Sequence, residues 1–247
     1  KHKPRDILQV MNQLKKEQYS GIYKPLFHTE LLQKDLYSVH KVPSQRSFNH
    51  AYYIYDKESG GKVFINESVY SSMNQNELYA LSLHEGVPGH HLERYLTNNN
   101  PKIPEYIKMN SYPIYSEGWA FYCEDLYNYR DNTRYFYKIE YDILRTLRLI
   151  IDTGLHYYGW GFETCFQYMR KYSKMSSDKS IRDEIIRYLC IPGQALSYKM
   201  GGEFLKVLQK YYTHNGMSIQ DFHKMILDNG PGHFEIIFQD IFLKVMR

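Results

Sequence analysis

The feature that most constrains this chain is the stretch Leu83-His84-Glu85-Gly86-Val87-Pro88-Gly89-His90-His91-Leu92-Glu93. A His followed at once by a Glu begins the H-E-x-x-H pattern of zinc peptidases. In that pattern two His at positions i and i+4 of one helix bind Zn²⁺, and the Glu activates a water molecule. Position i+4 is here Pro88, which cannot bind a metal. The nearest candidates for a second ligand are therefore His90 and His91.

An unbroken helix brings neither candidate to His84, because position i+6 points elsewhere and position i+7 lies roughly 10 Å further along the axis. Pro88 disrupts such a helix, since it lacks an N–H and its ring clashes with the carbonyl group of residue i−4. Gly89 permits backbone angles that other residues avoid. A bulge here would bring His90 to the position of the second ligand, with His91 as its neighbour. Alternatively, the Pro-Gly pair ends one helix and a second helix begins near His91.

Composition excludes several classes of protein. The 247 residues allow one large domain or two small ones. Lys and Arg are scattered and the net charge is only +4, so no nucleic-acid-binding surface is expected. Three widely spaced cysteines argue against a disulfide framework or a Cys-based zinc site. No apolar run reaches the roughly 20 residues of a membrane span, and no signal peptide is visible. A cytoplasmic location is therefore favoured, although the chain begins at Lys1 rather than Met.

The hydrophobic pattern predicts a mostly α-helical fold of many helices with one small β-hairpin. The hairpin is expected from strands at 51–55 and 63–66, just before the helix that carries the motif. Its edge could pair with an extended peptide, or the hairpin could simply cover the core. Helices are expected at about 6–19, 28–36, 77–98, 113–129, 133–158, 162–171, 181–189, 194–212, 219–227 and 234–245, and loops at 42–50 and 102–112.

A third metal ligand is expected from Glu117, which lies 27 residues after His90 on a following predicted helix, with Gly118 beside it to allow close helix approach. Two His, one Glu and a water molecule form a standard catalytic zinc site. The alternative for Glu117 is a solvated residue in the first turn of a helix. Glu85 is the expected general base. Glu124, two turns after Glu117, is expected to orient a ligand His through the N–H of its ring.

Other polar residues are candidates for the surroundings of this site. Arg148, Asp152 and His156 share one helix face, and they form either a substrate-binding row or an ordinary row of ion pairs. Gln194 and Tyr198 also share a face, and both side chains can donate hydrogen bonds to an oxyanion.

Two cations and one amide complete the set of candidates. Arg187 or Lys199 could hold a substrate carboxylate. Asn66, at the end of the returning strand, could hydrogen-bond the backbone of a substrate. Taken singly, each of these residues is more often structural.

Four motifs in order resemble the domain-of-unknown-function family 885, a family of gluzincin-like zinc metallopeptidases. The similarity extends from about Ala51 to the C-terminus. One departure is Glu93, where the family usually has Gln; Glu93 is expected at the surface. The motifs are His84–Leu92, Glu117–Glu124, Arg148–His156 and Arg187–Lys199.

The resemblance implies a mostly α-helical zinc peptidase with a deep helical cleft. Family members are about twice as long, so this chain resembles their motif-bearing C-terminal half. An N-terminal half or a second chain would then complete the cleft. Otherwise 1–247 is a single catalytic domain with a helical lead-in at 1–50, the hairpin at 51–66 and a helical body with the metal site at 75–247.

The expected function is zinc-dependent hydrolysis of peptide bonds, in short peptides or near a C-terminus. Zn²⁺ would be held by His84, His90 and Glu117, and Tyr198 together with His156 would stabilise the oxyanion. The expected partner is a peptide, with no nucleic acid and no membrane span. One alternative is a catalytically inactive structural or binding component that retains the peptidase fold. Another is hydrolysis of an amide or ester bond in a small molecule.

Overall fold

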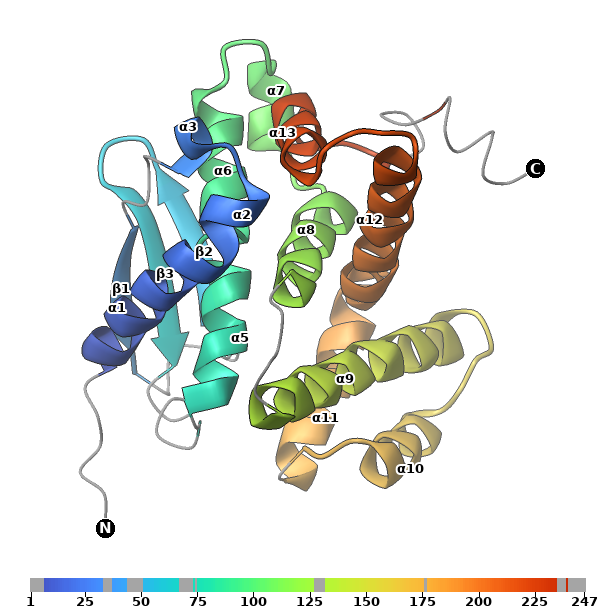
Figure 1. The fold of residues 1–247 in the computed structure, drawn as a ribbon. Helices are drawn as coiled ribbons and strands as arrows, with labels where there is room; N and C mark the ends of the chain where they lie inside the picture. Colours follow the sequence, from blue (N-terminus) through green and yellow to red (C-terminus); the bar gives the residue numbers. More distant parts are fainter. Residues whose placement is uncertain are drawn as a thin grey trace.

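Figure 1 shows a computed structural model of the chain, which describes residues 7–32, 37–43, 51–66, 73, 75–126, 132–175, 177–234 and 239. Helices dominate it, and one small sheet lies at the left side of this view, so the expected mostly α-helical fold is confirmed. No helix within the described ranges is both long and apolar enough to span a membrane.

The N-terminal segment packs a helix against the sheet. The helix expected at 6–19 is observed, and its buried Met11 and Leu14 belong to the main core. The helix expected at 28–36 is described only over its first part, since 33–36 lie outside the described residues. The elements are α1 (Ile7–Gln18), the π-helical turn η1 (Tyr19–Tyr23), α2 (Lys24–Leu26) and α3 (Thr29–Leu32).

The sheet has three strands in the order β1-β3-β2 (Figure 1), namely β1 (Tyr37–Val42), β2 (Ala51–Asp56) and β3 (Gly60–Asn66). β2 and β3 form the expected hairpin, with Tyr53 opposite Val63. β1 runs parallel to β3, with Val39 opposite Val63. The expectation of a purely helical lead-in at 1–50 is therefore wrong over β1. A parallel pair needs a distant partner strand, which the local pattern does not reveal.

The helical body follows the sheet. A short helix, α7, interrupts the stretch 102–112, which was expected to be a loop. Most of the helix expected at 234–245 lies outside the described residues. The elements are α5 (Gln75–Glu85), α6 (His90–Asn99), α7 (Glu105–Met109), α8 (Pro113–Asp125), α9 (Asn132–His156), α10 (Phe162–Tyr172), α11 (Asp178–Cys190), the 3₁₀ turn η3 (Gln194–Leu196), α12 (Ser197–His214) and α13 (Ile219–Asn229).

The apolar side chains form two separate clusters. The main core lies between the sheet and helices α1, α5, α6, α8, α12 and α13, and it includes the fully buried Trp119 and Leu83. The second core lies among α9, α10 and α11, in the lower part of Figure 1, and is built around Ile151, Met169 and Ile185.

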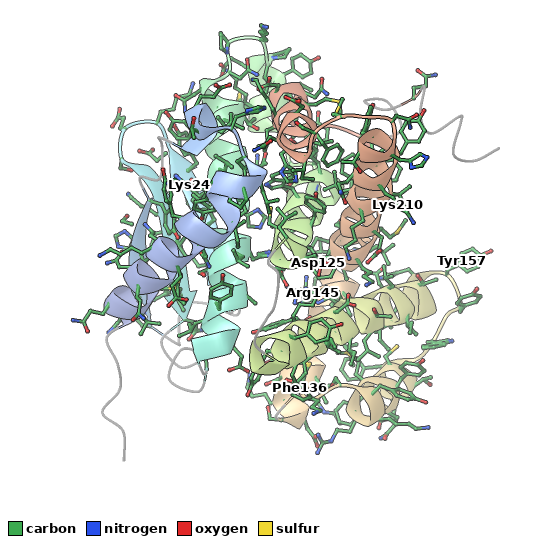
Figure 2. All side chains as sticks on the ribbon, in the orientation of Figure 1. Lys24, Asp125, Phe136, Arg145, Tyr157 and Lys210 are labelled. Carbon is green, nitrogen blue, oxygen red and sulfur yellow. The ribbon has the colours of Figure 1, made fainter. Side chains whose placement is uncertain are left out.

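Helix α8 lies against α12 at backbone contact. A Cβ atom added to Gly118 would lie 2.6 Å from the Cα atom of Gly201, and one added to Gly201 would lie 2.2 Å from the carbonyl oxygen of Ile114. The close helix approach expected at Gly118 is therefore made, and its partner is α12. Asp125, labelled in Figure 2, ends α8 and forms ion pairs with Lys138 on α9 and Lys206 on α12. These contacts hold the helix that carries Glu117.

Candidate metal centre

The Pro-Gly pair separates two helices. Helix α5 ends at Glu85 and α6 begins at His90. Between them the N–H of Gly89 donates to the carbonyl oxygen of Leu83 at 3.1 Å, and the N–H of His91 donates to that of Gly86, also at 3.1 Å. The backbone therefore follows the two-helix alternative rather than a bulge within one helix. The tight turn nevertheless brings His90 to His84, as the bulge hypothesis required.

Steric contacts and hydrogen bonds fix the conformation of this turn. A Cβ atom added to Gly89 would lie 2.0 Å from the carbonyl oxygen of His84. Any residue with a side chain would therefore clash with the backbone here, and only glycine fits. The indole N–H of Trp119 donates to the carbonyl oxygen of Pro88 at 2.7 Å. The hydroxyl of Tyr23 donates to the carbonyl oxygen of Val87. Main-core residues thus hold the loop that positions the two His side chains.

His84, His90 and Glu117 form a compact cluster, with one ligand atom from each lying within 4.8 Å of the other two. The Oε2 atom of Glu117 lies 3.4 Å from Nε2 of His84 and 3.5 Å from Nε2 of His90. The two imidazole rings are nearly perpendicular, with centroids 4.8 Å apart. The sequence placed these three residues in one site, and the structure brings them together.

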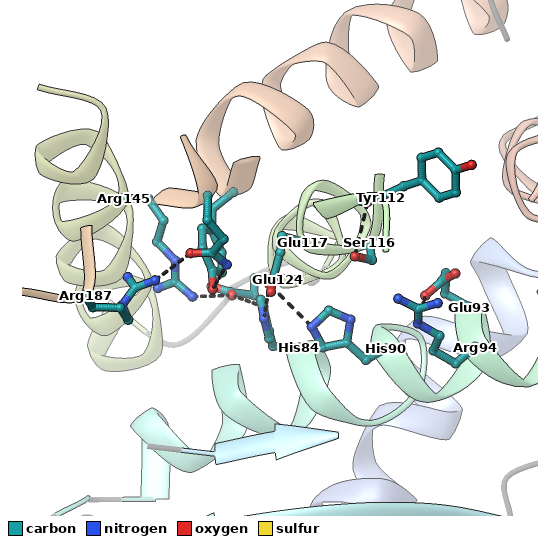
Figure 3. A network of polar contacts seen from close by, with 12 residues as sticks. His84, His90, Glu93, Arg94, Tyr112, Ser116, Glu117, Glu124, Arg145 and Arg187 are labelled. Atoms are coloured by element: carbon teal, nitrogen blue, oxygen red, sulfur yellow. Dashed lines mark hydrogen bonds and ion pairs between the residues drawn. The ribbon is translucent and has the colours of Figure 1, made fainter. Parts of the chain in front are cut away.

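The second nitrogen of His84 is held by a buried carboxylate. Nδ1 lies 2.8 Å from Oε1 of Glu124, and the guanidinium group of Arg145 donates to the same oxygen at 2.8 Å. Figure 3 shows the resulting line of contacts from Arg145 through Glu124, His84 and Glu117 to His90. Because a carboxylate only accepts, Nδ1 donates its proton to Glu124, which leaves Nε2 as the nitrogen that could bind a metal after losing its own proton. The role expected for Glu124 matches this geometry.

Arg145 was missed by the sequence reasoning. The signal was present, because Arg145 lies three residues before Arg148 and so shares its helix face. What the sequence did not show is that its partner, Glu124, lies 21 residues away on another helix.

The cluster is an electrostatic site for a cation. Burial lowers the pKa of His84, but the carboxylates of Glu117 and Glu124 outweigh it and raise that pKa to about 9. Burial raises the pKa of Glu117, but the two imidazoles outweigh it and hold that pKa well below its usual range. The carboxylates thus favour positive charge on His84, and the imidazoles keep Glu117 in its negatively charged form.

Glu85 lies beside the cluster. Its side chain is buried, and no hydrogen-bond partner of its Oε2 atom occurs among the described residues. Burial raises the pKa of its carboxyl group. Both Glu85 and the cluster border a cavity of about 440 Å³, a size that suits a small ligand.

Tyr198 and Gln194 border the same cavity, as the sequence suggested. The Tyr198 ring stacks on that of His84, with centroids 6.2 Å apart and planes 18° apart. Gln194 donates to the Tyr198 hydroxyl at 3.1 Å, which leaves the phenolic hydrogen free for another acceptor. Burial raises the pKa of Tyr198, so the hydroxyl stays protonated.

Two predicted residues of α9 do not reach the cavity. His156 is exposed at the end of α9, and its Nε2 donates to the carbonyl oxygen of Tyr188 at 3.1 Å. Its expected role at the oxyanion therefore does not hold. Asp152 is buried, and both its oxygens accept the N–H of Gly193 at 3.2 Å. It fixes the turn before η3 instead of binding substrate.

The predicted cation Lys199 also lies outside the cavity lining. It is paired with Asp142 at 2.5 Å and with Glu203 at 2.9 Å, so it is not available to a substrate carboxylate. Asn66, buried at the end of β3, does not border the cavity either.

His91 faces the sheet rather than the cluster. Its Nδ1 lies 2.9 Å from the hydroxyl of Tyr53, and its ring packs on Tyr37 with centroids 5.0 Å apart. It is therefore a structural neighbour of the site. Glu93, expected at the surface, is completely buried. The reason is that α6 is packed against β2, α8 and α13, so little of its surface faces solvent.

Two solved structures share this fold. One is described as "the putative lipoprotein from Colwellia psychrerythraea"; it is 25% identical, with a TM-score of 0.83, and the match covers 95% of this chain and 42% of that one. The other, "a putative lipoprotein of unknown function from Shewanella oneidensis", is 17% identical with a TM-score of 0.73, and the match covers 98% and 46%. This chain thus spans less than half the length of either. No curated protein matches it.

These comparisons correct one expectation and identify the family. Both neighbours carry the description of a lipoprotein, which overturns the expected cytoplasmic location. Residues 4–235 match the family described as "Bacterial protein of unknown function (DUF885)", as the four motifs suggested. Because this match covers nearly the whole sequence, the chain belongs to the DUF885 family.

Proposed function

We propose that this chain is a zinc-dependent hydrolase that cleaves peptide bonds, with the gluzincin-like site that the resemblance implied. The observation that carries the proposal is the convergence of His84, His90 and Glu117 within 4.8 Å. Two imidazoles and one carboxylate are a standard donor set for catalytic zinc, with the fourth position open for water or substrate.

The residues fit a zinc ion on two further grounds. The Oε2 atom of Glu117 is buried without a hydrogen-bond partner in the described part of the chain, so it lacks the partner that a buried carboxylate oxygen requires. The carboxylates of Glu117 and Glu124 also raise the pKa of His84, which supports a site that favours positive charge.

In this proposal, a few residues carry out the steps of peptide hydrolysis. A bound zinc ion would polarise the scissile carbonyl group and lower the pKa of a water molecule to about 7. Glu85 would accept a proton from the attacking water and pass it to the departing amine. The hydroxyl of Tyr198 would donate a hydrogen bond to the oxyanion. Glu124 and Arg145 would keep Nε2 of His84 directed at the metal.

Metal analysis and a peptidase assay test this function. The purified chain is expected to contain one zinc ion and to hydrolyse a mixture of short peptides, with activity lost on chelation and restored by zinc. A chain without zinc, or a zinc-loaded chain that releases no new amino groups from the peptides, would contradict the proposal.

We expect Glu124→Gln to weaken zinc binding by about tenfold, because partners of a metal-binding His set its orientation and basicity. The amide keeps the size of the side chain but loses the charge that holds Nδ1 of His84 and the Arg145 guanidinium group. Competition with a chromophoric chelator measures the affinity. Glu203→Gln, on α12 and paired with Lys199 and Lys206, is the control. Equal affinities for the two variants would show that Glu124 does not act on the ligand.

The main alternative is a zinc-holding component that does not hydrolyse peptides. The observation that favours it is that the chain spans only 42% and 46% of its two structural neighbours, so residues needed for activity could lie in the remainder. Zinc binding without hydrolysis would support this alternative. The lipoprotein description of both neighbours supports a site of action outside the cytoplasm.

A further inference from the structure

Three arginines border the cavity on its α9 and α11 side: Arg145, which is paired with Glu124, and the pair Arg148 and Arg187. Arg187 donates to the carboxylate of Glu184 at 2.9 Å and to the amide oxygen of Gln194 at 2.5 Å. Arg148 shares the same Glu184 oxygen, but at 3.5 Å. All four residues line the cavity. A carboxylate common to two guanidinium groups is therefore the main anion on this side.

The charges on this side do not balance. Burial raises the pKa of Glu184, but Arg148 and Arg187 outweigh it and lower that pKa to about 2, so Glu184 carries one negative charge at neutral pH. Asp152 also lies near Arg187, but it is outside the cavity lining and both its oxygens accept the N–H of Gly193. Apart from the Arg145–Glu124 pair, two positive charges thus face the cavity against one negative charge. An anionic ligand would balance the second positive charge.

Arg148 is the less satisfied of the two arginines. Its ion pair with Glu184 is the longer one, and its Nε atom is buried without a hydrogen-bond partner among the described residues. A guanidinium group presents a planar fork of donors that matches a carboxylate. A substrate carboxylate would therefore supply the hydrogen-bond acceptor that the Nε atom of Arg148 lacks.

The arginine pair lies close to the metal cluster, with Tyr198 as their common neighbour. The guanidinium carbon of Arg148 lies 4.7 Å from the centre of the Tyr198 ring, and the centre of the His84 ring lies 6.2 Å from the same point. An extended residue spans roughly 3.5 Å. A peptide with its carboxylate at Arg148 would therefore place a peptide bond near the cluster after only one or two residues.

We propose that Arg148 and Arg187 bind the C-terminal carboxylate of a peptide substrate, so that the chain removes one or two residues from peptide C-termini. The cleavage part of this inference rests on the function proposed above, whereas the carboxylate binding does not. In the reaction the C–N bond breaks as the oxygen of one water molecule bonds to the carbonyl carbon. Both protons of that water end on the departing amine, which leaves as an ammonium group, and the water oxygen stays in the new carboxylate.

Matched peptides test the inference with the zinc-loaded chain. Two peptides share one sequence and end in a free carboxylate or in an amide, and the third has a glutamate as its last residue and ends in an amide. One charge-assisted contact makes kcat/KM for the free acid about 10- to 100-fold higher than for the amide. The amide with a glutamate side chain stays as slow as the plain amide. Mass spectrometry of the acid shows loss of one or two residues.

Variants of the arginines test whether Arg148 is responsible for the preference for the free acid. Arg148→Gln is expected to bring the ratio of kcat/KM for the free acid to kcat/KM for the amide close to one. Arg148→Lys, which keeps the charge, restores part of the preference. Arg182→Gln is the matched control, because Arg182 lies on α11 with Arg187 but pairs with Glu163 outside the cavity. The control keeps the full preference for the free acid.

The possible outcomes separate the two proposals. Equal cleavage of acid and amide overturns the carboxylate site while the proposed function stands. Fast cleavage of the glutamate amide also overturns it, because the carboxylate then comes from a side chain. If no peptide is cleaved, the proposed function fails and calorimetry on the same chain decides. Tighter binding of the acid than of the amide, lost in Arg148→Gln, supports the site, and equal affinities overturn it.

Discussion

Replacing Glu85 by Gln is expected to lower peptide hydrolysis by about 10³-fold, the scale of a lost general base. Glu85 borders the cavity beside the ligand cluster, and burial raises the pKa of its carboxyl group, which makes the carboxylate a stronger base. Gln has the same shape but accepts no proton. Because Glu85 is not one of the three clustered ligands, the zinc content measured by atomic absorption should not change.

Glu93→Gln is the matched control for this result. Glu93 is also buried, and burial also raises the pKa of its carboxyl group, but it does not border the cavity. Its variant should keep activity within a few-fold of the wild-type chain. If Glu85→Gln retained more than about a tenth of the wild-type kcat, the assignment of Glu85 as the base would be rejected.

The second large effect is expected from Gly89→Ala, which should destabilise the chain by about 3 kcal/mol and weaken zinc binding. The added methyl group would lie 2.0 Å from the carbonyl oxygen of His84 and 2.4 Å from that of Leu83. Both are backbone atoms, so the end of α5 must move, and His84 moves with it. Urea unfolding with and without zinc measures both consequences, because a weaker metal site adds less stability.

Gly161→Ala shows what a harmless glycine substitution costs. Gly161 has a φ of −71°, and no atom lies within 4 Å of an added Cβ. It precedes α10 as the N-cap residue, where alanine is somewhat less favourable than glycine, so a loss below about 1 kcal/mol is expected. Similar losses for the two variants would mean that the turn at Gly89 tolerates a side chain.

The cluster was predictable because its residues belong to local patterns. The His-Glu pair, the Pro-Gly break and His90 lie within seven residues, where backbone geometry limits the possibilities. Glu117 and Glu124 are two turns apart on one helix, so their common direction followed from the helical period. The turn itself was less predictable. Separate helices and a bulge differ only in hydrogen bonds that the sequence does not specify.

The residues that were missed or misplaced depend on contacts between distant segments. Lys199 was a reasonable carboxylate-binding candidate until Asp142, 57 residues away, was found to pair with it. Glu184, which joins the two cavity arginines, gave no signal of its own on an ordinary amphipathic helix. Strand β1 needed its partner β3. Each of these errors concerns a tertiary partner, not the local conformation.

The residues that line the cavity stand on helices that pack in two different apolar cores. The elements that hold the three clustered ligands, α5, α6 and α8, pack in the main core, whereas Arg148, Glu184 and Arg187 stand on α9 and α11, the helices of the second core. The same metal site can therefore be combined with different binding residues. Evolution or an engineer could alter the binding residues on α9 and α11 while leaving the packing around His84, His90 and Glu117 unchanged.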